Sequence, residues 1–199
     1  ISSIKHYETD TLKDLYMYNM GNVILQVTQN CNLRCEYCVY SGSYINRVHT
    51  NKRMSFETAV KTIDFLAAHS LNCNEVSIGF YGGEPLLEIE LIKKAVSYAK
   101  EVFGEKKVNF NMTTNATLLN MDIADFLVQN DFNITISLDG PRNIHNKNRI
   151  FANSNKGTFD LIMENIALIR EKYPFFDKKI SFNAVIDLKQ NVSCTNAVS

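Results

Sequence analysis

Apolar residues recur along this chain with two different spacings, and segments with one spacing alternate with segments with the other. In some segments every second residue is apolar, which predicts β-strands, and in others apolar residues recur every three or four positions, which predicts amphipathic helices. The predicted strands cover residues 23–27, 76–80, 108–112, 134–138 and 180–186. Strands that alternate with helices in this way predict an α/β fold with a parallel sheet and right-handed crossovers.

The ends of the predicted helices carry capping and stop signals. Ser55 and Thr158 stand where N-cap residues are expected, before two of the helices. Gly104 follows another helix as a C-terminal stop, and Pro174 lies just after the last one. These signals indicate that the helices are separate crossover elements.

The predicted strands are polar on their second face. The polar positions are Gln26, Thr28, Asn109, Asn111, Thr113, Thr135, Ser137 and Asp139. A strand covered by helices on both faces is apolar throughout, and a closed eight-stranded barrel fills its interior with Val, Ile and Leu. We therefore expect an open, incomplete barrel with a wet lumen. A sheet whose second face is merely solvated is the alternative.

Composition and charge narrow the possible partners. The 199 residues include 21 basic and 21 acidic side chains, so the formal net charge is zero, and 45% of residues are hydrophobic. Nucleic acids and anionic membranes normally require a basic surplus, and no apolar run is long enough for a transmembrane helix. We expect neither nucleic acid nor a membrane as a partner. Because the first residue is Ile1, the chain is expected to be processed or part of a longer one.

Three of the five cysteines lie within eight residues, in the loop after the first predicted strand. The full set is Cys31, Cys35, Cys38, Cys73 and Cys194. An odd, clustered set favours a reducing, cytoplasmic location over a disulfide scaffold, and the spacing indicates metal or cluster chemistry. Structural zinc needs four ligands, whereas three thiolates on an iron–sulfur cluster leave one iron open. Unrelated buried thiols are the alternative, and Cys73 itself is expected to be a buried thiol.

Three more unusual loops follow predicted strands. They are Tyr81-Gly82-Gly83-Glu84-Pro85, Thr113-Thr114-Asn115 and Asp139-Gly140-Pro141. The carboxyl ends of parallel strands share one edge of the sheet, where ligands bind. The two glycines would let the backbone approach a ligand closely, and Glu84 offers an acceptor for an ammonium group. A tight turn with a solvated glutamate is the alternative.

Two of these loops resemble motifs of a known enzyme family. The loop Cys31-Asn32-Leu33-Arg34-Cys35-Glu36-Tyr37-Cys38 resembles the signature of the radical S-adenosylmethionine (SAM) enzymes, and Gly82-Gly83-Glu84-Pro85 is similar to their motif for the SAM amino group. The resemblance extends from about Val23 to Ile186. It implies a partial (β/α)6 TIM-like barrel, of which about five strands lie in this chain, and a 4Fe-4S cluster on Cys31, Cys35 and Cys38. It also implies reductive cleavage of SAM to methionine and a 5′-deoxyadenosyl radical.

The same resemblance implies roles for other residues. Tyr37 would lie near the adenine, and Asn115 corresponds to the asparagine of a Thr-Asn-Gly turn in which Ala116 replaces the glycine. The segment Ser137-Leu138-Asp139-Gly140, followed by His145 and Arg149, is similar to a subgroup pattern whose serine and arginine bind the SAM carboxylate. The implied cofactor-binding set is therefore Tyr37, Gly82, Gly83, Glu84, Pro85, Asn115, Ser137, Asp139 and Arg149. A surface ion pair is the alternative role for Arg149, and Asn146 stands where an aspartate is usual.

The subgroup pattern is most similar to the branch that modifies peptides and proteins. The stretch from Cys38 to His49 resembles maturases of cysteine-rich peptides, so we expect thioether cross-linking of a ribosomally made, cysteine-rich precursor peptide. The alternatives are a formylglycine-generating sulfatase maturase and, in another class, a non-catalytic iron–sulfur or zinc module. An electron donor such as flavodoxin or ferredoxin is implied as a partner. No general base or substrate-binding residue is indicated.

The sequence divides into a lead-in segment (1–22), a core domain (23–187) and a tail (188–199). Peptide maturases of this branch usually continue into a cysteine-rich domain with auxiliary clusters, and only Cys194 lies in the tail. We therefore expect the chain to be the core of a longer protein, truncated before such a domain.

Overall fold

The computed structural model describes residues 6–40 and 49–186. Five strands alternate with helices along the chain. The elements are α1 (Leu12–Tyr18), β1 (Asn22–Thr28), α2 (Phe56–His69), β2 (Glu75–Gly82), the 3-10 helix η1 (Pro85–Glu88), α3 (Ile89–Phe103), β3 (Lys107–Thr114), α4 (Met121–Gln129), β4 (Asn133–Ser137), α5 (Arg142–Asn148), α6 (Phe159–Lys172), the 3-10 helix η2 (Pro174–Lys179) and β5 (Ile180–Asn183). The chain is therefore an α/β protein, as its periodicity predicts.

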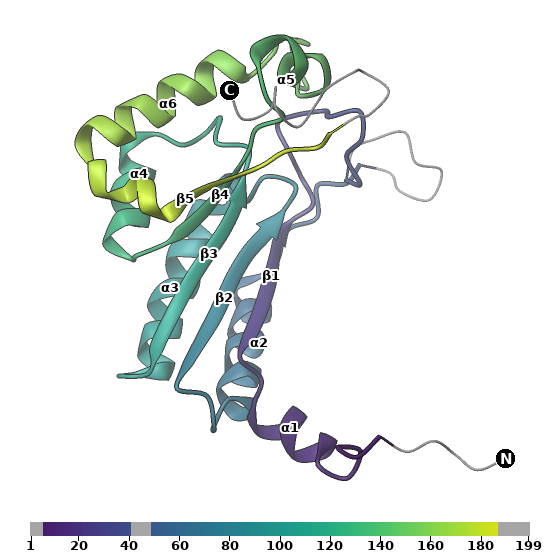
Figure 1. The fold of residues 1–199 in the computed structure, drawn as a ribbon, viewed down its shortest axis with the longest axis vertical. Coiled ribbons are helices and arrows are strands. Elements are labelled where there is room, and N and C mark those ends of the chain that lie inside the picture. Colours follow the sequence, from purple (N-terminus) through teal and green to yellow (C-terminus); the bar gives the residue numbers. More distant parts are fainter. Residues whose placement is uncertain (1–5, 41–48, 187–199) are drawn as a thin grey trace, which may run out of the picture.

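The five strands form one parallel sheet in the order β1-β2-β3-β4-β5. Each strand pairs with the next one in sequence, so every connection crosses over on the same side. Figure 1 shows α2 and α3 behind the strands, while the opposite face of the sheet is left open. In the described part of the chain β1 and β5 are both edges, so the sheet is an open, partial barrel.

The core lies between the sheet and the helices. Phe80 of β2, Phe110 of β3 and Phe132, just before β4, are almost fully buried, and their ring centroids lie 5.4 to 6.4 Å apart. Such offset aromatic contacts add to the burial of apolar area. Cys73 packs against this core but is only partly buried, because it precedes β2 at the edge of the sheet.

The helix ends confirm some of the capping signals and correct one. Ser55 accepts a hydrogen bond from the backbone N–H of Thr58 at 3.2 Å, and α3 ends at Gly104 with φ 57°. Thr158 does not cap α6 with its side chain. The first amide of that helix, at Phe159, instead donates to Oδ1 of Asn146 at 2.9 Å, because α5 folds back onto the start of α6.

The open face of the sheet carries the predicted polar side chains except for Thr28 and Asp139, which are both buried. Asn111, Thr113 and Thr135 are half-buried on this face, opposite the helices. Thr28 is only 1% exposed, because the pairing of β1 with β2 shifts register between Gln26 and Thr28 and turns the end of β1 inward. The polar face is therefore continuous up to the carboxyl ends of the strands.

The helices in the described ranges are short. The longest, α3, has 15 residues, whereas a membrane-spanning helix needs about 20 apolar ones. No helix in residues 6–40 or 49–186 is long and apolar enough to cross a membrane.

Candidate functional site

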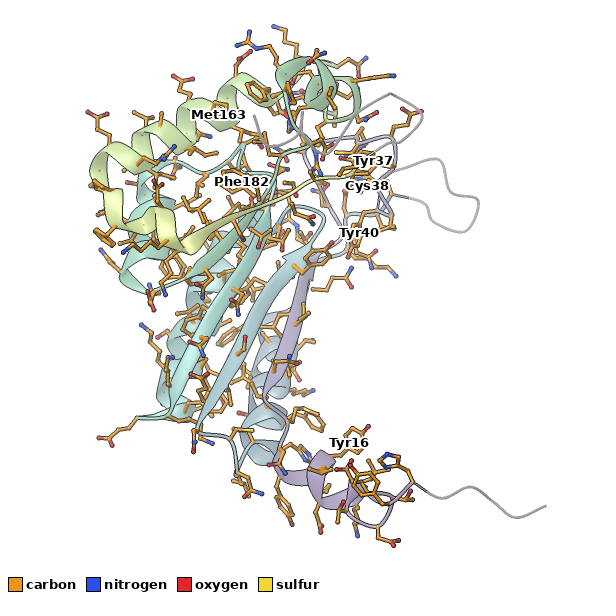
Figure 2. The ribbon with its side chains drawn as sticks, in the orientation of Figure 1. Tyr16, Tyr37, Cys38, Tyr40, Met163 and Phe182 are labelled. Atoms are coloured by element: carbon orange, nitrogen blue, oxygen red, sulfur yellow. The ribbon has the colours of Figure 1, made fainter. Side chains whose placement is uncertain are left out.

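A pocket of about 230 Å³ lies at the carboxyl ends of the strands. Segments that follow all five strands contribute to its lining. Nine of the twelve residues implied by the sequence line it, namely Cys31, Cys35, Tyr37, Cys38, Gly82, Gly83, Asn115, Ser137 and Arg149. Figure 2 shows Tyr37, Cys38 and Tyr40 close together at this end of the sheet, far from Tyr16 of α1. The parallel topology therefore brings the loops together as expected.

The cysteine loop is held in shape by Arg34. Its Nη1 donates to the carbonyl oxygens of Cys31 and Leu33, each at 2.7 Å, and its backbone N–H donates to the carbonyl of Ile150 at 3.0 Å. Leu33 is buried and anchors the loop against Phe151. These contacts fix the path of the loop without using any cysteine sulfur.

All three cysteines line the pocket, and two of their sulfurs, those of Cys31 and Cys38, also accept hydrogen bonds from N–H donors. Cys31 Sγ accepts from the backbone N–H of Leu33 at 3.4 Å and from Asn115 Nδ2 at 3.7 Å, and Cys38 Sγ accepts from the backbone N–H of Tyr40 at 3.3 Å. All three cysteines are free thiols. N–H groups directed at sulfur stabilise thiolates and tune iron–sulfur clusters. The donor set therefore fits metal-bound thiolates.

Burial keeps the thiols of Cys31 and Cys35 protonated when nothing is bound to them. Desolvation raises the pKa of Cys31 to about 12 and that of Cys35 to about 11. For Cys35 the charge of Arg149 opposes this effect and lowers the pKa only in part. Because thiolates are the metal-binding form, a metal group in this pocket would displace their protons.

Three thiols near one pocket raise the choice between a single metal ion and a cluster. Within the described ranges, no three His, Cys, Asp or Glu side chains are grouped so that they could hold one metal ion. A zinc ion binds each thiolate at about 2.3 Å, which requires the sulfurs to converge closely. A cluster is larger and can accept thiolates on separate irons. Three thiolates can therefore hold a cluster and leave one iron for another ligand.

Gly82 and Gly83 allow two loops to pack against each other. A Cβ on Gly82 would lie 2.1 Å from the carbonyl oxygen of Thr28, and one on Gly83 would lie 2.1 Å from that of Asn30. Gly82 also has φ 147°, which side chains disfavour. The close approach that the glycines permit is thus to the chain after β1, and their backbone forms part of the pocket wall.

Glu84 lies behind the wall and does not line the pocket. Its carboxylate accepts hydrogen bonds from the backbone N–H of Leu86 at 3.0 Å, from Thr114 Oγ1 at 2.7 Å and from the backbone N–H of Asn115 at 2.7 Å. Complete burial raises its pKa, and the hydrogen bonds from Asn115, Thr114 and Leu86 oppose that rise. Pro85 is also buried and begins η1. Both residues therefore position the ends of β2 and β3.

Asn115 belongs to a small network that the sequence did not indicate. Its Nδ2 donates to Asn32 Oδ1 at 3.0 Å, and Asn32 Nδ2 donates to Thr117 Oγ1 at 2.8 Å. Thr117 closes the network by donating to Asn115 Oδ1 at 2.7 Å. Ala116, which replaces the glycine of the motif, is buried and has φ 58°. The turn therefore keeps the left-handed conformation even without glycine.

Asp139 connects Tyr37 to Arg149 beside the pocket. The Tyr37 hydroxyl donates to Asp139 Oδ2, and Arg149 Nε lies 3.0 Å from the same oxygen. The Arg149 guanidinium also lies 5.5 Å from the centroid of the Tyr37 ring. Burial lowers the pKa of Arg149, but the charges of Asp139, Tyr37 and Cys35 and the hydrogen bond to Asp139 together outweigh this effect and raise the pKa. Arg149 is thus a buried, charged pocket residue and not a surface ion pair.

A neutral histidine, His145, is connected by hydrogen bonds to the backbone of both Asp139 and Arg149. His145 Nδ1 accepts from the backbone N–H of Asp139 at 3.3 Å, so its Nε2 carries the proton and donates to Thr158 Oγ1 at 2.9 Å. Thr158 in turn donates to the carbonyl of Arg149 at 3.1 Å. Burial, aided by the charge of Arg149, lowers the pKa of His145 to about 4. His145 therefore positions Asp139 and Arg149 as an uncharged group.

Sequence reasoning missed several residues that complete the pocket. Tyr40 and Tyr81 form an aromatic pair with centroids 6.4 Å apart, and Asn183, at the end of β5, and Val185, just after it, line the pocket. The backbone N–H of Val185 donates to Asp139 Oδ1 at 3.1 Å. The available signal was position, because Tyr40 lies two residues after Cys38 and Tyr81 immediately precedes Gly82. The part of the Cys38 to His49 stretch at 41–48 lies outside the described residues.

Comparison with known proteins identifies the family. The model of the Radical SAM superfamily matches residues 25–193. The cysteine-type anaerobic sulfatase-maturating enzyme of Clostridium novyi (strain NT) is 33% identical over 180 residues, which cover 89% of this chain and 46% of that protein. The radical SAM cyclopropyl synthase TigE of Paramaledivibacter caminithermalis is 25% identical over 84% of this chain and 38% of that protein.

A solved structure has the same fold. The structure of native anSMEcpe with bound AdoMet superposes with a TM-score of 0.74 at 27% identity and covers 89% of this chain and 47% of that one. The chain thus spans about half the length of the relatives that it matches. Its partial barrel, with a cysteine loop after the first strand, defines a class of cluster-binding α/β proteins. Within that class the chain belongs to the radical SAM superfamily.

Proposed function

We propose that this chain is the SAM-cleaving core of a radical SAM enzyme that modifies a peptide or protein. The observation that carries the proposal is the convergence of three free thiols and the Gly82-Gly83 backbone on one pocket. Cys31, Cys35 and Cys38 would bind a 4Fe-4S cluster and leave one iron for SAM. The N–H donors at the sulfurs support this assignment.

The rest of the pocket would hold SAM. Ser137 and Arg149 would bind its carboxylate, since a guanidinium is well suited to a carboxylate. The backbone at Gly82 and Gly83 would face its amino group, and Tyr37 would contact the adenine. Asn115 would fix the pocket wall through Asn32. Glu84, Pro85 and Asp139 do not line the pocket and would instead position the residues that do.

Cluster and SAM together would supply one-electron cleavage of a carbon–sulfur bond and a 5′-deoxyadenosyl radical that abstracts hydrogen from the substrate. The chain's own residues serve this chemistry by orientation. The ion pair of Asp139 with Arg149 holds the guanidinium at the pocket. An electron donor such as flavodoxin or ferredoxin and a cytoplasmic location complete the proposal.

For the reaction on the substrate we favour thioether cross-linking of a cysteine-rich precursor peptide. The subgroup pattern from Ser137 to Arg149 supports a peptide-modifying enzyme. A formylglycine-generating sulfatase maturase is the second candidate, and the similarity to the Clostridium novyi enzyme over 89% of this chain favours it. A related solved structure contains anSMEcpe with AdoMet and the Cp18Cys peptide, which supports a peptide substrate in either case.

The test of SAM cleavage is direct. The protein is reconstituted with iron and sulfide without oxygen, reduced with dithionite and given SAM, and chromatography measures 5′-deoxyadenosine and methionine. We expect equal amounts of the two products from the wild type and none from Cys31→Ala. A reduced protein that binds SAM but never cleaves it would be the non-catalytic module and would refute the proposal.

Mass spectrometry of a cysteine-containing peptide after turnover distinguishes the two substrate reactions. A thioether cross-link removes two hydrogen atoms from the peptide and keeps its sulfur. Formylglycine formation from cysteine also removes two hydrogen atoms but replaces the sulfur with oxygen. Retention of sulfur in the modified product is the expected result. The division into a lead-in (1–22), a core (23–187) and a tail (188–199) stays a prediction.

A further inference from the structure

A second hollow lies on the open face of the sheet, next to the first pocket. It has a volume of about 230 Å³, and Tyr81 and Thr113 line both hollows. The remaining lining comes from β1 to β4, namely Asn22, Val23, Ile24, Ser77, Gly79, Phe80, Asn111, Met112, Asn133 and Thr135. We call it the lumen hollow. A ligand that fills the first pocket would therefore have direct access to the lumen hollow.

The lumen hollow exists because one strand position lacks a side chain. The register places Ile24, Gly79, Asn111 and Asn133 in one row across β1 to β4. Neighbouring side chains on this face stand on both sides of Gly79, so the missing Cβ leaves a gap in the middle of the floor. A Cβ built there would meet Ile24 Cγ1 at 3.3 Å and nothing closer. The glycine is thus not required by backbone packing, unlike Gly82 and Gly83.

The floor of the hollow is polar but uncharged. Asn111 Nδ2 donates to Ser77 Oγ at 2.7 Å, and Asn133 and Thr135 add another amide and hydroxyl. Amides and hydroxyls offer both donors and acceptors. Apart from the Tyr81 phenol, no ionisable side chain is among the described residues that line it.

The nearest charges on the contributing strands neutralise each other. Glu75 and Lys107, at the amino ends of β2 and β3, form an exposed ion pair at 2.8 Å outside the hollow. A charged substrate side chain placed on the floor would lose hydration without gaining a counter-ion, which is unfavourable. An uncharged hydrogen-bonding group would exchange water for protein partners at little cost.

We propose that the lumen hollow binds an uncharged, hydrogen-bonding segment of the peptide substrate and disfavours charged side chains. Asn111 would supply the central hydrogen bond, and the gap at Gly79 would admit the segment. This inference rests on the proposed function, because it assigns the substrate class of the same enzyme. It adds substrate-binding residues where the sequence indicated none.

Binding measurements without turnover test the proposal. The probe is a short fluorescent peptide of Gly, Ala and Ser with one central Cys, and two matched probes carry Asp or Lys instead of that Cys. Anisotropy is measured with the reconstituted protein and SAM, in the absence of oxygen and reductant. We expect the neutral probe to bind about tenfold tighter than either charged probe.

Three variants locate the binding site. Gly79→Val fills the gap, and the fold should tolerate it because Ile24 is 71% exposed and can turn away. We expect it to weaken binding of the neutral probe about tenfold or more. Asn111→Ala should weaken binding about threefold to tenfold through loss of a hydrogen bond. Asn109→Ala is the matched control, on the same strand and face but outside the hollow, and should bind like the wild type.

The outcomes separate this inference from the proposed function. Thermal unfolding shows whether Gly79→Val is folded, and if it is not, Asn111→Ala decides. The inference is overturned if the wild type does not bind the neutral probe, if charged probes bind equally well, or if Asn111→Ala binds like Asn109→Ala. SAM affinity should be equal in all variants. Absence of SAM cleavage in the wild type would refute the proposed function, whatever these affinities are.

Discussion

The carboxylate of Glu84 accepts a hydrogen bond from the backbone N–H of Asn115 at 2.7 Å, although the two residues are 31 positions apart. Glu84 follows β2 and Asn115 follows β3, so this bond connects the ends of neighbouring strands. The same carboxylate also binds Thr114 and Leu86. The motif glutamate therefore supports the pocket wall from inside the protein.

Glu84→Gln should destabilise the fold by about 1–3 kcal/mol. The glutamine amide group would face the N–H of Asn115 or another donor, since all three partners donate to the carboxylate. Denaturant unfolding at neutral pH measures the change. Glu57→Gln, at a side chain that is 74% exposed, should change stability by less than about 0.5 kcal/mol. Equal effects of the two substitutions would contradict the buried role of Glu84.

His145 should make stability depend on pH. Its folded pKa of about 4 lies below the ordinary value of 6.5, so the unfolded chain binds more protons between these values and stability falls as the pH falls through this window. The contribution is on the order of 3 kcal/mol. Unfolding of the wild type and His145→Asn between pH 7 and 4 should show a smaller pH dependence in the variant. His6→Asn, at an exposed position, should retain the wild-type slope.

Arg149→Lys should weaken SAM binding about tenfold or more. A lysine ammonium cannot contact Asp139 and a SAM carboxylate with the geometry of a guanidinium. Isothermal titration of the reconstituted protein measures the affinity. Arg170→Lys is the control, because Arg170 pairs only with Asp177 on the surface in the contacts recorded for the described chain. If Arg149→Lys bound SAM normally, Arg149 would be a structural residue only.

Cys35→Ala should abolish the visible absorbance of the reconstituted cluster, whereas Cys73→Ala should leave it unchanged. Cys35 lines the pocket, and Cys73 lies before β2 at the opposite end of the strand. Iron and sulfide analysis of both variants accompanies the spectra. Loss of the cluster in both would indicate a site with four cysteine ligands.

Gly83→Ala should lower stability by about 1–3 kcal/mol or more. The added Cβ would lie 2.1 Å from the carbonyl oxygen of Asn30, so one of the two backbone segments must move. Gly21→Ala provides the comparison, since nothing lies within 4 Å of a Cβ there. Denaturant unfolding of both variants measures the difference. A Gly83→Ala protein as stable as Gly21→Ala would show that the loops do not pack as described.

Much of the fold was predictable because its signals are local. The apolar periods located all five strands to within a few residues, and β5 is shorter than expected because it ends at Asn183. The short helices α1 and α5 were missed, since neither has a long apolar period. Helix α5 presents only His145 as a buried residue, and its position depends on contacts with α6.

The candidate site was predictable in outline but not in detail. Cysteine spacing and the glycine pair identified loops that the parallel topology then brought together. Nothing in the sequence indicated that Glu84 faces Asn115, or that Asn32 and Thr117 complete the network around it. Such contacts depend on which side chains meet across different strands, and a one-dimensional pattern does not contain that information.

The sequence by itself determined the alternation of elements, the polar second face of the sheet and the three candidate cluster ligands, because periodicity and spacing are properties of neighbouring residues. Only the tertiary structure decided that Asn146 caps α6 in place of Thr158. It also decided that Gly79 leaves space for the lumen hollow, whereas Gly82 and Gly83 allow the loop after β2 to pack against the chain after β1. These outcomes depend on strand register and on contacts between distant segments. Identical residue types therefore took different roles according to what lies across the sheet from them.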